Sequence, residues 1–283
     1  MIKVIECPRD AMQGIDSFIA TDQKVEYINQ LLKVGFDTID FGSFVSPKAI
    51  PQMRDTSQVL ESLDLSSTKS KLLAIVANER GGEEACSFEQ INFIGFPLSI
   101  SETFQKRNTN KSIAEALSTL NELKNTADKT SKELVVYISM GFGNPYHDPY
   151  DPDIVMQFSG IMKSIGVKII SLADTIGVST PGQIKTLFGS LRTEHPDTEF
   201  GVHLHSHPAT AREKVEAAFE AGCKRFDGAL LGFGGCPMAE DSLVGNIDTR
   251  VILGMLADKG FNGVVNTSEF QKAIAMASRV FPN

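Results

Sequence analysis

Short apolar runs alternate with amphipathic stretches along almost the whole chain. The runs are rich in β-branched residues and continuous rather than alternating, which is typical of parallel strands covered on both faces. They predict strands over 2–6, 38–41, 71–77, 90–96, 134–139, 168–172, 199–203 and 225–229. Helical spacing predicts helices over 22–34, 49–63, 79–87, 111–128, 151–165, 181–193, 208–221 and 246–259, with one more over 268–278.

The stretch 208–221 shows how such helix boundaries are read. Pro208 suits a first helical turn, where its missing N–H costs nothing. Apolar Val215, Ala218 and Phe219 follow the i, i+3, i+4 spacing of a helix face, and Gly222 ends it. By contrast, the polar stretch 100–111 lacks this spacing and is predicted to be a long loop after a strand.

Eight strand-then-helix units predict an α/β fold, a (β/α)₈ TIM barrel with an extra helix at the C-terminus. We treat residues 1–283 as a single catalytic domain, because no low-complexity linker or block of charge divides them. An open, doubly wound parallel sheet is the alternative for the same order of elements.

Composition narrows the class of protein. With 283 residues and 42% hydrophobic content, the chain can bury a large core. The net charge of -8, with both signs interspersed, argues against nucleic acid as a partner. The first residues lack the pattern of a secretory signal, and no apolar run approaches the roughly 18 residues of a membrane span. Four scattered cysteines predict free thiols, so we expect a cytoplasmic protein.

The most informative chemistry is the pair of histidines in Val202-His203-Leu204-His205. Side chains two residues apart on a strand point to the same face, so the two imidazoles lie side by side. Such a pair is half of a metal site and needs only oxygen ligands from elsewhere. The alternative is a pair of half-buried polar residues with ordinary hydrogen-bond partners.

Other polar residues follow the predicted strands at their carboxyl ends. In a barrel this rim carries the chemistry. They are Arg9, Asp10, Asp40, Tyr137, Ser139, Asp174, Thr175, Cys236 and Asn246. Each also has a structural interpretation on its own: Asp174 could cap a helix and Arg9 could pair with an acid. Their clustering on one rim favours a site.

The sequence resembles the HMG-CoA lyase family, within the wider group of aldol- and Claisen-type barrel enzymes, over essentially its whole length. The matching segments are Arg9-Asp10-Ala11-Met12-Gln13, Ser43-Phe44-Val45-Ser46-Pro47-Lys48, Pro51-Gln52-Met53, Ser101-Glu102, Ser171-Leu172-Ala173-Asp174-Thr175-Ile176-Gly177, Val202-His203-Leu204-His205 and Gly234-Gly235-Cys236-Pro237.

The resemblance implies a metal site and three further roles. Asp10, His203, His205 and Asn246 would bind one divalent cation, Mg²⁺ or Mn²⁺ rather than zinc, since no thiolate is among them. Arg9 would stabilise an enolate oxyanion, and Cys236 would protonate the enolate carbon. Asp40 would either help proton transfer or hold Arg9. The residues expected to contact substrate are Gln13, Ser43, Tyr137, Asp174 and Thr175, of which the last two also have a structural interpretation.

The implied activity is cleavage of 3-hydroxy-3-methylglutaryl-CoA, or a related 3-hydroxyacyl substrate, to acetyl-CoA and acetoacetate through an enolate. The alternative within the same barrel group is another aldolase or a Claisen condensing enzyme that acts on a 2-keto acid. A third possibility is a non-catalytic barrel that binds a small molecule or a partner protein. The resemblance also implies a homodimer with a small-molecule substrate, an acyl-CoA or a hydroxy or keto acid.

Three departures from the family pattern leave the acyl substrate open. After His205 the chain continues with Ser206-His207, which adds a third imidazole. The segment from Cys236 to Asn246 is one residue longer than in the family. Basic residues expected to meet the CoA phosphates are missing around 15–16 and at 135, which removes charge-assisted hydrogen bonds from that site.

Overall fold

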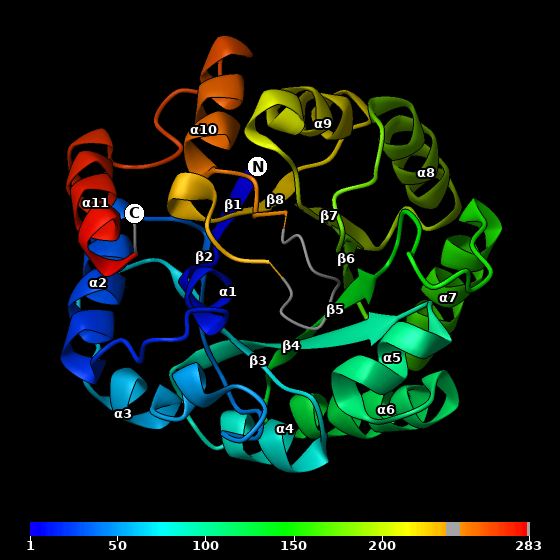
Figure 1. Ribbon diagram of the computed structural model, residues 1–283, viewed down its shortest axis with the longest axis horizontal. Coiled ribbons are helices and arrows are strands. Elements are labelled where there is room, and N and C mark those ends of the chain that lie inside the picture. Colours follow the sequence, from blue (N-terminus) through cyan, green and yellow to red (C-terminus); the bar gives the residue numbers. More distant parts are fainter. Residues whose placement is uncertain (236–243, 282–283) are drawn as a thin grey trace.

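Eight parallel strands form a closed barrel in sequential order (Figure 1). The computed structural model describes residues 1–235 and 244–281. The strands are β1 Lys3–Glu6, β2 Thr38–Ser43, β3 Lys71–Ile75, β4 Ile91–Ser99, β5 Glu133–Ser139, β6 Ile169–Asp174, β7 Glu199–Leu204 and β8 Arg225–Gly228. Since β8 pairs with β1, the sheet has no open edge, which confirms the TIM barrel and excludes the open sheet.

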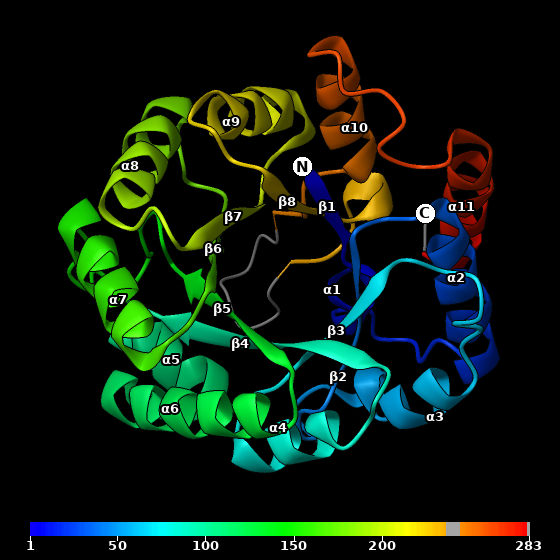
Figure 2. The ribbon, with the colours of Figure 1, turned by 180° about the vertical axis from the view of Figure 1, so that it is seen from behind.

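Helices surround the barrel on its outside, as both views show (Figures 1 and 2). They are α2 Thr21–Val34, α3 Thr56–Glu61, α4 Glu79–Cys86, α5 Glu102–Thr109, α6 Ile113–Lys129, α7 Pro152–Ile165, α8 Pro181–Glu194, α9 Pro208–Glu220, α10 Thr249–Asp258 and α11 Thr267–Val280. The short helix α1 Pro8–Gln13 lies inside this ring, directly after β1 (Figures 1 and 2). Short 3₁₀ turns lie at Pro51–Met53 and Leu230–Gly232. All eight predicted strands are present, and the predicted helix over 49–63 is divided between a 3₁₀ turn and α3.

The prediction of a loop over 100–111 was wrong, because this stretch contains α5. Ser101 caps the helix: its Oγ accepts a hydrogen bond of 3.1 Å from the backbone N–H of Phe104. The ring of Phe104 is buried, and the side chain of Gln105 accepts a 2.8 Å hydrogen bond from the N–H of Ser99. Contacts of Phe104 and Gln105 with other parts of the fold therefore stabilise a helix that the spacing of apolar residues in this stretch does not predict.

The last helix, α11, packs beside α2, as both views show (Figures 1 and 2). The ring of Tyr27 meets Phe281 edge to face at 5.6 Å between centroids, and Phe36 meets Phe270 at 6.2 Å. The side-chain amide of Gln30 donates to the backbone oxygen of Glu269 at 2.9 Å. The predicted extra helix is thus part of the barrel's outer layer.

The cysteines and the lengths of the helices can also be compared with the predictions from the sequence. Cys7, Cys86 and Cys223 are buried free thiols, as the scattered spacing predicts. Cys236 lies outside the described residues. No helix within residues 1–235 and 244–281 is both long and apolar enough to cross a bilayer.

Candidate functional site

Three potential metal ligands meet at the carboxyl ends of β1 and β7. Asp10 lies in α1, directly after β1, while His203 and His205 lie in β7 and just beyond it. One ligand atom from each of the three lies within 4.8 Å of the other two. The Nε2 atoms of the two imidazoles are 3.3 Å apart. The alternation of side chains on β7 therefore places both rings on one face, as the sequence predicts.

Asn246 joins this cluster from the segment after β8. Residue 246 forms an isolated antiparallel bridge with His205, and its Nδ2 donates to Oδ2 of Asp10 at 2.6 Å and to the backbone oxygen of Phe233 at 2.9 Å. Gly234 has a positive φ of 104°, and a Cβ there would lie 2.4 Å from Nδ2 of Asn246. A glycine is thus needed where the two parts of this segment approach each other.

The electrostatics of the cluster fit a divalent cation. Burial disfavours the charged form of Asp10, but Arg9 and the two imidazoles outweigh it and lower the pKa of Asp10 to about 2. Burial, and then the neighbouring His203, lower the pKa of His205 to about 4, so its ring is neutral at pH 7. An anionic carboxylate and a neutral imidazole are the ligand forms that a divalent cation requires. The donor set of one carboxylate, two imidazoles and an amide suits Mg²⁺ or Mn²⁺ better than softer ions.

Arg9 lies beside the cluster and is held by three side chains. Its Nε and Nη2 donate to the carboxylate of Asp40, with 2.5 Å between Nη2 and Oδ2. Its Nη1 donates to Oδ1 of Asp10 at 2.8 Å and to Oε1 of Gln13 at 3.0 Å. Four of its five N–H groups are therefore bound within the described part of the chain. The remaining one, on Nη2, is left for a ligand.

Asp40 reaches the site only through Arg9. Its side chain is 1% exposed and it does not border the cavity that contains the ligand cluster. Burial raises the pKa of Asp40 to about 6, although Arg9 opposes this shift. Of the two roles that the sequence leaves open, this placement favours holding Arg9.

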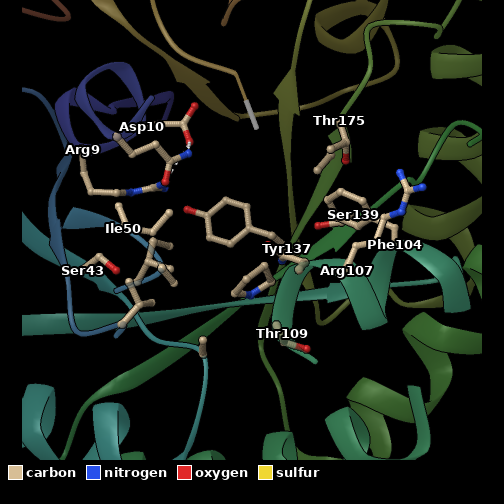
Figure 3. A pocket seen from close by; sticks show the side chains of 18 of the residues that line it. Arg9, Asp10, Ser43, Ile50, Phe104, Arg107, Thr109, Tyr137, Ser139 and Thr175 are labelled. Atoms are coloured by element: carbon tan, nitrogen blue, oxygen red, sulfur yellow. Dashed lines mark hydrogen bonds and ion pairs between the residues drawn. The ribbon is translucent and has the colours of Figure 1, made fainter. Parts of the chain in front are cut away.

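A cavity of about 410 Å³ opens above the cluster. Figure 3 shows Tyr137 between Arg9 on one side and Phe104 and Arg107 on the other. Polar residues line it: Arg9, Asp10, Gln13, Ser43, Ser139, Thr175, His203 and His205. Its lining also includes apolar Val45, Ala49, Ile50 and Phe104 and the segment from Arg107 to Lys111. The cavity thus combines polar and apolar side chains with two basic residues, Arg107 and Lys111, which we call the basic rim.

The residues predicted to contact substrate separate into two groups. Gln13, Ser43, Tyr137 and Thr175 line the cavity. Asp174 does not: its carboxylate is buried and accepts hydrogen bonds from the backbone N–H groups of residues 178 and 179, from the hydroxyl of residue 179 and from the ammonium group of residue 214. The structure therefore places Asp174 in a support of the β6–α8 loop.

The third imidazole named above, His207, does not join the two others. It is exposed and is the N-cap residue of α9, beyond the end of β7, so it shares no face with His203 and His205. Cys236, the predicted proton donor, lies outside the described residues.

Sequence reasoning missed Asp227 and the basic rim at Arg107 and Lys111. Asp227 lies on β8, and its Oδ2 is 3.3 Å from Nδ1 of His203. The signal was the alternation of Arg225 and Asp227 in a short strand, which places two charges on one face. The rim was missed because 100–111 was interpreted as a loop.

Comparisons with known proteins identify the family of the chain. The chain matches the family described as HMGL-like over residues 3–277. It is 36% identical over 249 residues to hydroxymethylglutaryl-CoA lyase YngG of Bacillus subtilis, an alignment that covers 88% of this chain and 82% of that protein. It is also 32% identical to the cytoplasmic 3-hydroxy-3-methylglutaryl-CoA lyase of Rattus norvegicus, over 96% of this chain and 79% of that one.

Solved structures give the same relationship. An HMG-CoA lyase from Bacillus subtilis superposes with a TM-score of 0.91 at 33% identity and covers 99% of this chain and 93% of its own. An HMG-CoA lyase from Acinetobacter baumannii, in complex with coenzyme A and 3-methylmalate, has a TM-score of 0.91 at 28% identity, over 99% and 91% of the two chains. With its closed barrel, its Asp-His-His cluster and this match over almost its whole length, the chain belongs to the HMGL-like family.

Proposed function

We propose that this protein is a divalent-metal-dependent carbon–carbon lyase that cleaves 3-hydroxy-3-methylglutaryl-CoA to acetyl-CoA and acetoacetate. The observation that carries the proposal is the meeting of Asp10, His203 and His205 beside Arg9 at the floor of one cavity. The names of the similar proteins, hydroxymethylglutaryl-CoA lyases of bacteria and mammals, support the choice of substrate.

In this proposal Asp10, His203, His205 and Asn246 hold Mg²⁺ or Mn²⁺. When bound, the cation supplies Lewis-acid stabilisation of negative charge on substrate oxygens. The amide of Asn246 is fixed next to Asp10 by its hydrogen bond of 2.6 Å, so it is close enough to the carboxylate to complete the ligand set.

Arg9 is proposed to bind the oxyanion of the enolate that cleavage leaves on the thioester. Its guanidinium cannot turn freely, because Asp40, Asp10 and Gln13 each accept a hydrogen bond from it. A donor fixed before the reaction stabilises developing charge without the cost of reorienting. The remaining N–H of Nη2 is the group that performs this role.

Protonation of the enolate carbon is assigned to Cys236, as the family resemblance implies. Substrate contacts are assigned to Ser43, Tyr137 and Thr175, which line the cavity, and to Gln13, which binds both Arg9 and Asp10. Asp174 is assigned a supporting role.

The apolar and basic lining of the cavity supports an acyl-CoA rather than a free acid. Its apolar wall, which includes Ile50 and Phe104, suits a pantetheine arm, and the side chains of Arg107 and Lys111 at the rim suit phosphate. These two residues supply the positive charge that the sequence lacks around 15–16 and at 135. The complex of the Acinetobacter enzyme with coenzyme A supports this assignment.

The test is turnover of 3-hydroxy-3-methylglutaryl-CoA by purified protein loaded with Mg²⁺ or Mn²⁺, with acetyl-CoA and acetoacetate both quantified. We expect equal amounts of the two products, loss of activity with EDTA and its return with metal. Asp10→Ala is the matched inactive variant. Folded, metal-loaded protein that leaves this thioester intact but cleaves a non-thioester hydroxy acid would contradict the substrate assignment.

We also propose that the protein works as a homodimer in the cytoplasm. The buried free thiols of Cys7, Cys86 and Cys223 suit a reducing compartment. Light scattering of the purified protein tests the dimer: a mass near 62 kDa, twice the 30.8 kDa of the chain, is expected.

A further inference from the structure

Beneath the ligand cluster, the barrel interior contains a second layer of buried polar side chains. Asp227 on β8 is the register partner of His203 on β7, so both side chains point into the barrel. Oδ2 of Asp227 lies 3.3 Å from Nδ1 of His203. The Asp227 side chain is fully buried, and that of His203 is 12% exposed. This carboxylate contacts a proposed metal ligand from the side opposite to the metal.

The two nitrogens of His203 therefore have different partners. Nδ1 faces Asp227, whereas Nε2 lies 3.3 Å from Nε2 of His205 on the side of the cluster with Asp10. An ionised carboxylate only accepts hydrogen bonds, and a neutral imidazole carries one proton. A proton on Nδ1 can therefore be donated to Asp227, while Nε2 is the nitrogen that faces the ligand cluster.

Neighbouring groups fix the ring in this orientation. The ring of Tyr137 meets His203 edge to face, with 5.7 Å between centroids and 82° between planes. Gly95 on β4 leaves space for that tyrosine, since a Cβ at position 95 would lie 2.6 Å from Cδ1 of Ile75 and 3.2 Å from Cε2 of Tyr137. Rotation of His203 away from Asp227 is blocked on this side.

The charge of Asp227 has its own buried counterpart. Arg225 lies two residues earlier on β8, on the same face, and its side chain is 1% exposed. Gly201 makes room for it, because a Cβ there would lie 2.9 Å from Cγ and Cδ of Arg225. Burial disfavours the charged guanidinium, but the acidic groups around it, Asp227 first and then Tyr137 and Glu199, outweigh this effect and raise the pKa of Arg225. Arg225 thus compensates the charge of Asp227 through space, while its Nη1 lies 3.5 Å from Oε1 of Glu199.

We propose that Asp227 is a positioning residue that holds His203 with Nδ1 protonated and Nε2 free to bind the metal. The inference rests on the proposed metal site. The alternative is that Asp227 serves only to neutralise Arg225 and has no effect on the imidazole. The two roles differ in what they predict for metal affinity and for the protonated nitrogen of His203.

The first experiment measures binding of Mn²⁺ to purified protein from the electron paramagnetic resonance signal of the free ion. We expect Asp227→Asn and Asp227→Ala to weaken binding by about 10- to 100-fold, as for other carboxylates behind a metal-binding histidine. Glu6→Gln is the matched control, because it replaces a buried acid whose hydrogen-bond partners, Leu230 and Thr249, are not proposed metal ligands, and it should leave the affinity unchanged. Wild-type affinity in both Asp227 variants would overturn the inference; absence of binding in the wild-type protein would instead refute the proposed metal site.

The second experiment needs neither metal nor a folded variant of Asp227. Nitrogen-15 spectra of histidine-labelled wild-type protein distinguish Nδ1–H from Nε2–H imidazoles, and the resonances of His203 are identified by their loss in His203→Gln. We expect Nδ1 of His203 to carry a proton, which it donates to Asp227. A spectrum in which Nδ1 of His203 carries no proton would overturn the inference.

Discussion

Asp40 binds Arg9 side-on, with Nε 3.0 Å and Nη2 2.5 Å from the same carboxylate oxygen. The pair is buried, since the side chains of Arg9 and Asp40 are 9% and 1% exposed. A planar guanidinium held in this way has a fixed direction as well as a fixed position. The orientation of the proposed oxyanion donor is therefore set by an acid that does not touch the substrate cavity.

We predict that Asp40→Asn lowers kcat about 10- to 100-fold and leaves the Kd for Mn²⁺ within about twofold of wild type, since Asp10 still holds Nη1 of Arg9. Arg9→Met should have the larger effect, about 10²- to 10³-fold in kcat, because it removes the donor itself. Steady-state kinetics with 3-hydroxy-3-methylglutaryl-CoA and Mn²⁺ titrations measure both quantities. If Asp40→Asn lost metal as completely as Asp10→Ala, the division of roles between the two acids would be wrong.

The basic rim should contribute to binding of the CoA moiety and should not affect the reaction of the acyl group. We predict that Arg107→Ala combined with Lys111→Ala raises KM for the CoA thioester about 10-fold or more, with kcat little changed, because a charge-assisted hydrogen bond contributes about 1.5–3 kcal/mol. The same variant should show no change in KM for a thioester truncated to pantetheine, which has no phosphates.

Lys106→Ala is the control for that measurement. Lys106 precedes Arg107 on α5 and forms a salt bridge with Glu102 on the surface. Lys106 does not line the cavity. An equal rise in KM from Lys106→Ala would show that general surface charge, rather than the rim, attracts the CoA ester.

Glu6 should make stability depend on pH. This buried carboxyl accepts hydrogen bonds from the N–H of Leu230 at 2.8 Å and the hydroxyl of Thr249 at 2.6 Å, yet burial raises its pKa to about 8. Because the pKa of Glu6 is higher in the folded state than in the unfolded state, the contribution of Glu6 to stability is fully present below pH 4.5 and is lost as the pH rises through 8. Because one proton changes the free energy of unfolding by about 1.4 kcal/mol per pH unit, the shift from 4.5 to about 8 corresponds to a loss on the order of 5 kcal/mol.

We predict that Glu6→Gln flattens this dependence. We measure the free energy of unfolding of both proteins in urea at pH 5, 7 and 9, and we expect the value for the variant to rise relative to that of the wild-type protein as the pH increases. If the free energy of unfolding changed equally with pH in the two proteins, Glu6 would not titrate between these pH values.

The ammonium group of Lys214 should contribute to the free energy of unfolding through contacts with Asp174 and with the backbone at His205. It is buried with Asp174, with 2.9 Å between Nζ and Oδ2, and it also donates to the backbone oxygens of Gly177 and His205. Lys214→Met leaves a buried carboxylate without its partner, and we expect a loss of about 3–5 kcal/mol in the free energy of unfolding.

Two further variants complete that measurement. Asp174→Asn combined with Lys214→Met should recover part of the loss, because no uncompensated charge remains. Lys185→Met, which breaks the exposed pair with Glu220, should cost less than about 1 kcal/mol. A loss from Lys214→Met as small as that from Lys185→Met would contradict the buried ion pair.

The sequence predicts the barrel well because parallel strands covered on both faces are continuous apolar runs, and all eight were found. It predicts the face shared by His203 and His205 for the same local reason, the period of two on a strand. It fails for α5, where a serine cap and one buried ring replace helical spacing. Predictions of strands, helices and shared faces depend only on residues that are close together in the sequence.

What the sequence does not reveal depends on partners from distant elements. Asp174 follows a strand end and so was expected to contact substrate, but its carboxylate is bound by Lys214, 40 residues later in the chain. Asp227 was overlooked because its partner, His203, belongs to the adjacent strand. The residue of a neighbouring strand that lies beside Asp227 can be identified only once the pairing of β7 with β8 is known.

The contact between α2 and α11 has a consequence for synthesis on the ribosome. Gln30 and Glu269, which are hydrogen-bonded, are 239 residues apart, and β1 pairs with β8. A nascent chain therefore carries the uncovered apolar side of α2 until nearly all of the barrel has been translated. Contacts of such long range slow folding and prolong exposure to aggregation, so production in cells should depend on chaperone supply and improve at low temperature.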